Sequence, residues 1–105
     1  LSELNRSKLI LPFIEKWANS AWHLFVVKTN NRSLLQGKLS SMGIDTIIHY
    51  PVPPHKQQAY RAHVSGFGDL RICESLANEV LSLPLHPQMN DAQCNYCVKT
   101  INEFC

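Results

Sequence analysis

The chain has 105 residues, of which 45% are hydrophobic and 17% charged, and it carries a formal net charge of +2. This length supports one domain with one core, and the composition is that of a folded protein rather than a disordered one. Its apolar runs are far shorter than the roughly 20 residues that cross a bilayer, and its basic residues are scattered rather than gathered in a stripe, so we expect neither a membrane nor a nucleic acid as partner.

The first 20 residues are expected to form a truncated linker helix and an edge strand, ahead of a domain that spans 21–105. Residues 1–7 have the pattern of a frayed helix end, and Lys8–Pro12 is a short extended segment whose proline suits only the edge or the end of a strand. The chain begins at Leu1 and shows no signal-peptide pattern. We therefore expect a piece excised from a longer protein.

The strongest strand signal is Trp22–Lys28, which is rich in aromatic and β-branched residues. An amphipathic helix is predicted after Asn30-Asn31, where an Asn can cap it, and Gly43 is placed just past its end. The apolar face of this helix consists of Leu34, Leu35, Leu39 and Met42. Thr46–Tyr50 predicts another strand, which ends at Pro51 because proline cannot continue a central ladder.

The second half of the chain predicts two more helices around a short strand. His55–Val64 is expected to form a helical turn, and Ser65–Asp69 a connection with two glycines. The next helix has an apolar face made of Ile72, Leu76, Ala77, Val80 and Leu81. Leu81–Pro87 is then a short extended run, and Asn90 followed by Gln93 resembles a capping box at the start of the last helix. This order predicts a two-layer α+β fold, with a small, mainly antiparallel sheet and helices on one face.

Cys94 and Cys97 form a C-x-x-C motif, which could indicate a disulfide or a zinc site. A second C-x-x-C that would complete a four-sulfur site is missing, and Cys73 stands alone in the sequence. One face of the last helix would carry Cys94, Cys97, Ile101, Phe104 and Cys105. We therefore interpret these sulfurs as small core hydrophobes and expect no metal site, and reduced thiols favour a cytoplasmic protein.

Five histidines are many for a chain of this length, and three of them have ordinary structural explanations. His23 lies inside a predicted strand beside Trp22, where a structural role suffices. His63 falls in a stretch where we expect a solvated side chain. His86 precedes a proline at the end of a strand, where turn geometry accounts for it. None of the three is predicted to be a functional residue.

His49, Tyr50 and His55 differ, because they cluster around a proline-fixed loop at the end of a predicted buried strand. Polar groups positioned in this way often bind ligands, and spacing alone leaves a ligand site and a rigid turn equally open. Two loop histidines with Asp45 as the nearby acid make a weak metal site. The sequence has no Gly-rich phosphate loop, no H-E-x-x-H and no nucleophile elbow, so no catalytic residue is predicted.

The order and spacing of four segments are more specific than any single motif. The segments are WHLFVVK (Trp22–Lys28), RSLLQGKLSSMGIDTIIHYPVPPHKQQAY (Arg32–Tyr60), CESLANEVLSLPLHPQM (Cys73–Met89) and VKTINEF (Val98–Phe104). Their most specific pieces are Gly43-Ile44, His49-Tyr50-Pro51-x-Pro53-x-His55-x-Gln57, Leu81-Ser82-Leu83-Pro84 and His86-Pro87. Over nearly its whole length the chain resembles the C-terminal region of the DegT/StrS family of pyridoxal-phosphate-dependent nucleotide-sugar aminotransferases. The family often has Pro-x-Ala-Glu where this chain has Arg71-Ile72-Cys73-Glu74, which puts the local turn in doubt.

The resemblance implies the small domain of a fold-type I transferase, which packs against a large domain in what is usually a homodimer. In that family the loop that matches His49 to His55 approaches the nucleotide sugar, so His49, Tyr50 and His55 are the expected substrate contacts. The lysine that binds pyridoxal phosphate, the acid that faces its ring nitrogen and the donors to its phosphate belong to the large domain of the family. We therefore expect a chain that binds no pyridoxal phosphate and is inactive alone.

The parent protein implied by the resemblance transfers an amino group to a keto sugar in the synthesis of polysaccharide, lipopolysaccharide or antibiotic sugars. Two alternatives stay open. One is a free-standing α+β binding or interaction module without catalytic activity. The other is a domain of a related sugar dehydratase or regulator, because the family also includes such members.

Overall fold

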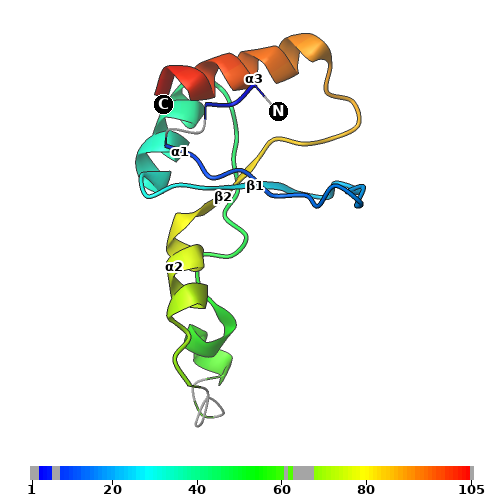
Figure 1. Cartoon of the computed structure of the whole chain (residues 1–105). Helices are drawn as coiled ribbons and strands as arrows, with labels where there is room; N and C mark the ends of the chain where they lie inside the picture. Colours follow the sequence, from blue (N-terminus) through cyan, green and yellow to red (C-terminus); the bar gives the residue numbers. More distant parts are fainter. Residues whose placement is uncertain (1–2, 6–7, 61, 63–67, 105) are drawn as a thin grey trace.

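The computed structural model describes residues 3–5, 8–60, 62 and 68–104 (Figure 1). Its elements are β1 (Phe25–Lys28), α1 (Arg32–Ser41), the 3-10 turns η1 (Pro54–Lys56) and η2 (Gln58–Tyr60), α2 (Arg71–Glu79), β2 (Val80–Leu83) and α3 (Asp91–Phe104). The described residues thus form an α+β fold with a two-stranded antiparallel sheet and three α-helices, and the predicted fold class is confirmed.

β1 and β2 pair antiparallel, with Phe25 opposite Leu83 and Val27 opposite Leu81. All four of these side chains are buried, whereas the intervening positions of β1 are only half-buried. This alternation is the one that a strand with one face on a core produces. The strand predicted at the start of this region is present but begins at Phe25, three residues later than the pattern suggested.

Two further segments touch the sheet through single bridges. Ile10 exchanges both backbone hydrogen bonds with Lys28, at 2.8 and 2.9 Å, and Ile47 does so with Ser82, at 3.2 and 2.8 Å. Residues 8–12 thus meet β1 at a single residue pair. The full strand predicted over Thr46–Tyr50 is wrong, because the pairing ends after one residue pair. The prolines that follow it have no N–H group with which to extend a ladder.

α1 and α3 pack against each other on the same side of the sheet, and we call β1, β2, α1 and α3 the core layer (Figure 1). The buried side chains of the core are Leu4, Leu9, Phe25, Val27, Leu35, Leu39, Ile44, Leu81, Leu83 and Ile101. Gly43 ends α1 as predicted, with φ +71°, a conformation that residues with a Cβ rarely adopt. Its N–H donates to Ser40 O at 3.0 Å, and that of Ile44 donates to Leu39 O at 2.9 Å.

α2 extends away from the core layer together with η1 and η2 (Figure 1). The helix predicted to include Val80 and Leu81 ends at Glu79, and both residues belong to β2 instead. Pairing with β1 overrides the helical spacing of these two residues. Of the predicted face of α2, Ala77 is buried but Ile72 is 80% exposed. The apolar side of α2 is therefore largely outside the core.

α3 begins with the predicted capping box. Asn90 Oδ1 accepts from Gln93 N at 2.9 Å, and Gln93 Oε1 accepts from Asn90 N at 3.0 Å. The interpretation of the sulfurs as core residues is wrong for Cys94, which is exposed, and agrees with the half-buried position of Cys97. Cys105 lies outside the described residues. Within the described part of the chain, no helix is both long and apolar enough to cross a membrane.

The N-terminal segment packs onto α3. Asn102 Nδ2 donates to Glu3 O at 2.9 Å, and Asn102 Oδ1 accepts from Asn5 N at 2.7 Å. Leu4 and Leu9 are buried in the same core as the sheet. The start of the chain is therefore part of the packing that holds α3 in place.

Candidate functional site

An open pocket of about 650 Å³ lies between α2 and the segment that precedes it, residues 49–60, which we call the proline loop. The loop contributes His49, Tyr50, Val52, Pro53, Pro54 and Gln57, and the other wall consists of Asp69, Leu70, Ile72, Cys73, Leu76, Ala77 and Val80. The volume is in the range of small-molecule sites, and an apolar wall with a few polar groups is their usual composition. Two of the three predicted site residues, His49 and Tyr50, line this pocket.

His49 is held by the sheet. Its Nδ1 lies 2.9 Å from the hydroxyl oxygen of Ser82, which is only 5% exposed on β2. The same two segments are joined by the backbone bridge between Ile47 and Ser82. The contact with Ser82 therefore orients the His49 ring, and the backbone bridge holds the neighbouring segment against β2.

Tyr50 is the exposed member of the pair. Its ring packs edge-on to that of His49, with 5.5 Å between the ring centres, and the residue is 73% exposed. An aromatic ring with a hydroxyl at its end can stack on a base or sugar and also form a hydrogen bond. Tyr50 is thus an exposed residue of the pocket lining, beside a histidine that is hydrogen-bonded to β2.

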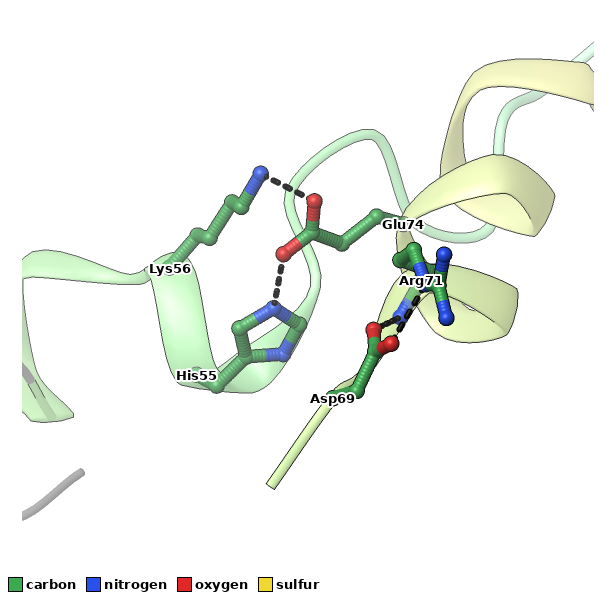
Figure 2. Close-up of polar contacts among 5 residues, drawn as sticks. All are labelled: His55, Lys56, Asp69, Arg71 and Glu74. Atoms are coloured by element: carbon green, nitrogen blue, oxygen red, sulfur yellow. Dashed lines mark hydrogen bonds and ion pairs between the residues drawn. The ribbon is translucent and has the colours of Figure 1, made fainter. Parts of the chain in front are cut away.

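His55 does not line the pocket, and Figure 2 shows that its ring points to Glu74 of α2. His55 Nε2 lies 3.1 Å from Glu74 Oε1, and Lys56 Nζ lies 2.8 Å from Glu74 Oε2. Hydrogen bonds from Lys56 and then His55 to the charged carboxylate lower the pKa of Glu74 below its ordinary value. Sequence reasoning missed this contact, because no local pattern links positions 55 and 56 to a helix almost 20 residues further on.

Asp69 stands at the start of α2 and lines the pocket. Its Oδ1 accepts from the backbone N–H of Arg71 at 3.0 Å, and its carboxylate also pairs with the Arg71 side chain (Figure 2). An acid at this position satisfies an N–H group of the first helical turn. Residues 71–74, whose sequence put the local turn in doubt, form the first turn of α2.

The remaining histidines do not join this site. His23 and His86 are exposed, and His63 lies outside the described residues. No group of three or more His, Cys, Asp or Glu that could hold a metal ion occurs in the part of the chain that the structure describes.

The lining of the pocket does not fit pyridoxal phosphate. The cofactor needs a lysine for its aldehyde and an acid for its ring nitrogen. Among the described residues no lysine lines the pocket, and the acid in its wall, Asp69, is paired with Arg71. The lysine of the proline loop, Lys56, is paired with Glu74. The described residues can contact a ligand but do not supply the groups that hold this cofactor.

The fold is that of a small α+β domain in which His49 and Tyr50 line an open pocket. The family model described as "DegT/DnrJ/EryC1/StrS aminotransferase family" matches residues 2–102, and the chain belongs to this family. The resemblance drawn from the sequence is thereby confirmed.

Among curated proteins, the chain is 42% identical over 93 residues to the erythromycin biosynthesis sensory transduction protein EryC1 of Saccharopolyspora erythraea, covering 89% of this chain and 25% of that protein. It is 38% identical over 94 residues to dTDP-3-amino-3,4,6-trideoxy-alpha-D-glucose transaminase of Streptomyces venezuelae, covering 90% and 25%. The chain thus spans about 25% of the length of these two relatives.

Solved structures show the same relationship. The chain superposes on S. venezuelae DesV, solved in complex with a ketimine intermediate, with a TM-score of 0.90 and 36% identity, covering 98% of this chain and 28% of DesV. A DegT DnrJ EryC1 StrS aminotransferase from Brucella abortus matches with a TM-score of 0.84 and 32% identity, covering 91% and 26%. The fold of this chain is therefore that of one part of these aminotransferases.

Proposed function

We propose that the chain is the C-terminal small domain of a pyridoxal-phosphate-dependent nucleotide-sugar aminotransferase. Its parent transfers an amino group, from a donor such as glutamate, to a keto sugar linked to a nucleotide. Support comes from the names of relatives: the S. venezuelae transaminase acts on a dTDP-linked sugar, and a Pseudomonas aeruginosa relative, 35% identical over 81 residues, is a UDP-2-acetamido-2-deoxy-3-oxo-D-glucuronate aminotransferase. Antibiotic-sugar or lipopolysaccharide synthesis is the corresponding pathway class.

In this proposal residues 1–20 are the end of a linker and an edge segment, and residues 21–105 are the small domain proper. A large domain packs against it and supplies the residues that hold pyridoxal phosphate, and two copies form a homodimer in the cytoplasm. The cofactor, when bound there, supplies the electron sink for amino transfer. This chain supplies substrate contacts and is inactive alone.

The observation that carries the proposal is the pair His49 and Tyr50 at the rim of the pocket. Ser82 fixes the ring of His49, while Tyr50 is exposed to a ligand. We propose that both contact the nucleotide sugar. His55 is the third proposed contact. Because an ionised carboxylate can only accept, Glu74 places the proton on His55 Nε2, and a neutral His55 ring then has Nδ1 as its acceptor for a sugar hydroxyl.

The experiment uses the full-length protein that carries this chain, assayed with a dTDP-linked keto sugar and glutamate. His49→Ala and Tyr50→Phe should raise KM for the sugar nucleotide by about tenfold, as expected when a binding contact is lost. Their free energies of unfolding should change far less than those of core variants. Kinetics unchanged in both variants would remove the proline loop from the site.

A second experiment tests the role of the chain itself. Purified alone and titrated with pyridoxal phosphate, the 105-residue chain should show no saturable change in absorbance and no transamination. A saturable change that one Lys→Ala variant abolishes would contradict the proposal, because the chain would then hold the cofactor itself.

A second candidate function is regulatory. EryC1 is named a sensory transduction protein, and a relative from Geobacillus stearothermophilus, 35% identical over 83 residues, is named a pleiotropic regulatory protein. In this alternative the chain is a binding module, or belongs to a regulator or sugar dehydratase. The gene sequence upstream distinguishes them: an upstream large domain with a cofactor lysine supports the aminotransferase, and a start codon just before Leu1 supports the module.

A further inference from the structure

Glu74 joins the two walls of the pocket without lining it. Its carboxylate binds two consecutive side chains of η1, with Oε1 3.1 Å from His55 Nε2 and Oε2 2.8 Å from Lys56 Nζ (Figure 2). Residues directly beside this contact do line the pocket, namely Pro54 from η1 and Cys73 from α2. The distance between the proline loop and α2 is therefore fixed at Glu74.

η1 transmits this contact because it is a rigid turn. Lys56 N donates to Pro53 O at 2.9 Å, and Gln57 N donates to Pro54 O at 3.1 Å. The two proline rings also fix their own φ angles. A contact at His55 and Lys56 therefore positions the whole turn rather than a single side chain.

We propose that Glu74 is a positioning residue for substrate binding: by holding η1 against α2, it fixes the width of the pocket that His49 and Tyr50 line. The inference rests on the proposed function and extends it to a residue that does not touch the pocket. Glu74 also affects His55. A carboxylate can only accept a hydrogen bond, so it favours the tautomer of His55 that carries the proton on Nε2.

A role in positioning can be separated from a role in stability. The side chains of Glu74 and Lys56 are 37% and 52% exposed, and ion pairs of such exposure contribute little to global stability. Glu74→Ala retains α2, because Ala is the best helix former. Glu79→Ala is the matched control: Glu79 lies on the same helix and pairs with Lys28 at 2.9 Å, but it does not line the pocket or touch η1.

The first measurement is amide hydrogen exchange in the full-length protein. In Glu74→Ala the amides of Lys56 and Gln57 should exchange about fivefold faster, while those of α3 stay unchanged, and Glu79→Ala should leave the η1 amides unchanged. The ring ¹⁵N shifts of His55 should move toward a mixture of tautomers in Glu74→Ala only. Unchanged exchange in η1, or equal acceleration throughout the domain, would overturn the inference and leave the proposed function intact.

The second measurement is steady-state kinetics with the dTDP-linked keto sugar. Glu74→Ala should raise KM about five- to tenfold with little change in kcat, because binding and not the chemical step depends on the loop. Glu74→Gln, which keeps one acceptor oxygen, should restore part of the loss.

The outcomes separate this inference from the proposed function. If η1 loosens and Tyr50→Phe raises KM, but Glu74→Ala leaves KM unchanged, Glu74 has no positioning role. If η1 loosens and neither Tyr50→Phe nor Glu74→Ala alters the kinetics, the proline loop is not a substrate site, and the proposed substrate contacts fail together with this inference.

Discussion

The core layer and the region formed by α2 and the proline loop are stabilised in different ways. The core layer buries aliphatic side chains from two strands, two helices and the N-terminal segment. In the second region large apolar side chains remain exposed, Ile72 and Tyr50 among them, and the two walls of the pocket meet through ion pairs of Glu74. Burial specifies a fold, whereas exposed apolar groups beside positioned polar ones are typical of a surface that meets a ligand or a partner.

The largest effect should come from the centre of the core layer. Leu81→Ala removes a side chain that is 0% exposed, and we expect it to lower the free energy of unfolding by about 2–5 kcal/mol. Ile72→Ala, in the exposed face of α2, should change it by less than about 1 kcal/mol. Urea unfolding of the two variants measures this contrast. Equal losses would show that α2 belongs to the same cooperative core, and the comparison of the two regions would not hold.

A second contrast lies within the core layer, between two glycines of the same chain segment. An added Cβ would meet nothing within 4 Å at either Gly37 or Gly43, so only the backbone conformation distinguishes them. Gly43→Ala should cost about 1–2 kcal/mol, because its φ of +71° is strained for a residue with a Cβ.

Gly37→Ala is the control for that substitution. Gly37 lies inside α1, where Ala is favoured over Gly by about 0.5–1 kcal/mol. This variant should therefore be more stable than the unsubstituted protein. The two changes in unfolding midpoint should have opposite signs. A stabilising Gly43→Ala would mean that the end of α1 adapts to the new residue.

Sequence patterns predicted the core layer better than the second region. A run rich in aromatic and β-branched residues located β1, and the pair Asn90 and Gln93 located the start of α3. These signals are local, since each is contained within a few residues. The apolar spacing places the end of α2 too late, because Val80 continues the helical pattern. Only the pairing of Val80 with β1 shows that it belongs to a strand.

The site could be predicted only in part for the same physical reason. A proline loop with two histidines indicated a positioned surface, and His49 and Tyr50 do lie at the pocket. The partners that position them come from distant elements: Ser82 holds His49, and Glu74 holds His55. Such contacts depend on the way in which the chain folds back, and no spacing within the loop encodes them.

Acid should loosen both regions, through two carboxylates of α2. The pKa of Glu74 is lowered from 4.5 by hydrogen bonds from Lys56 and His55, and that of Glu79 by a hydrogen bond from Ser75 and then by Lys28. A lowered folded pKa contributes stability that is present above about pH 4.5 and is lost as the pH falls through the folded value. Urea midpoints measured from pH 6 downward should therefore drop below about pH 4.5.

Replacing Glu74 and Glu79 in turn shows how much each carboxylate contributes to the drop in urea midpoint at low pH. Glu79→Ala should reduce the drop by removing the contact with Lys28 of β1, whereas Glu74→Ala should reduce it only slightly, because its exposed ion pairs contribute little to global stability. If both variants kept the full acid sensitivity of the parent, other groups would be responsible for it.

The smallest expected effect is a difference in alkylation rate among the described cysteines. Cys94 is exposed on α3, whereas burial, and then the neighbouring Cys94, raise the pKa of Cys97. Because the thiolate is the reactive form, iodoacetamide at pH 8 should alkylate Cys97 at least about threefold more slowly than Cys94. Cys73, in the wall of the open pocket, should also react faster than Cys97. The alkylation rate of each of the three cysteines is measured by mass spectrometry of the labelled peptides, whose fragment spectra assign the label to one cysteine. A Cys73 as slow as Cys97 would mean that the pocket is closed in solution, and the contrast between a packed core layer and an open second region would then be wrong.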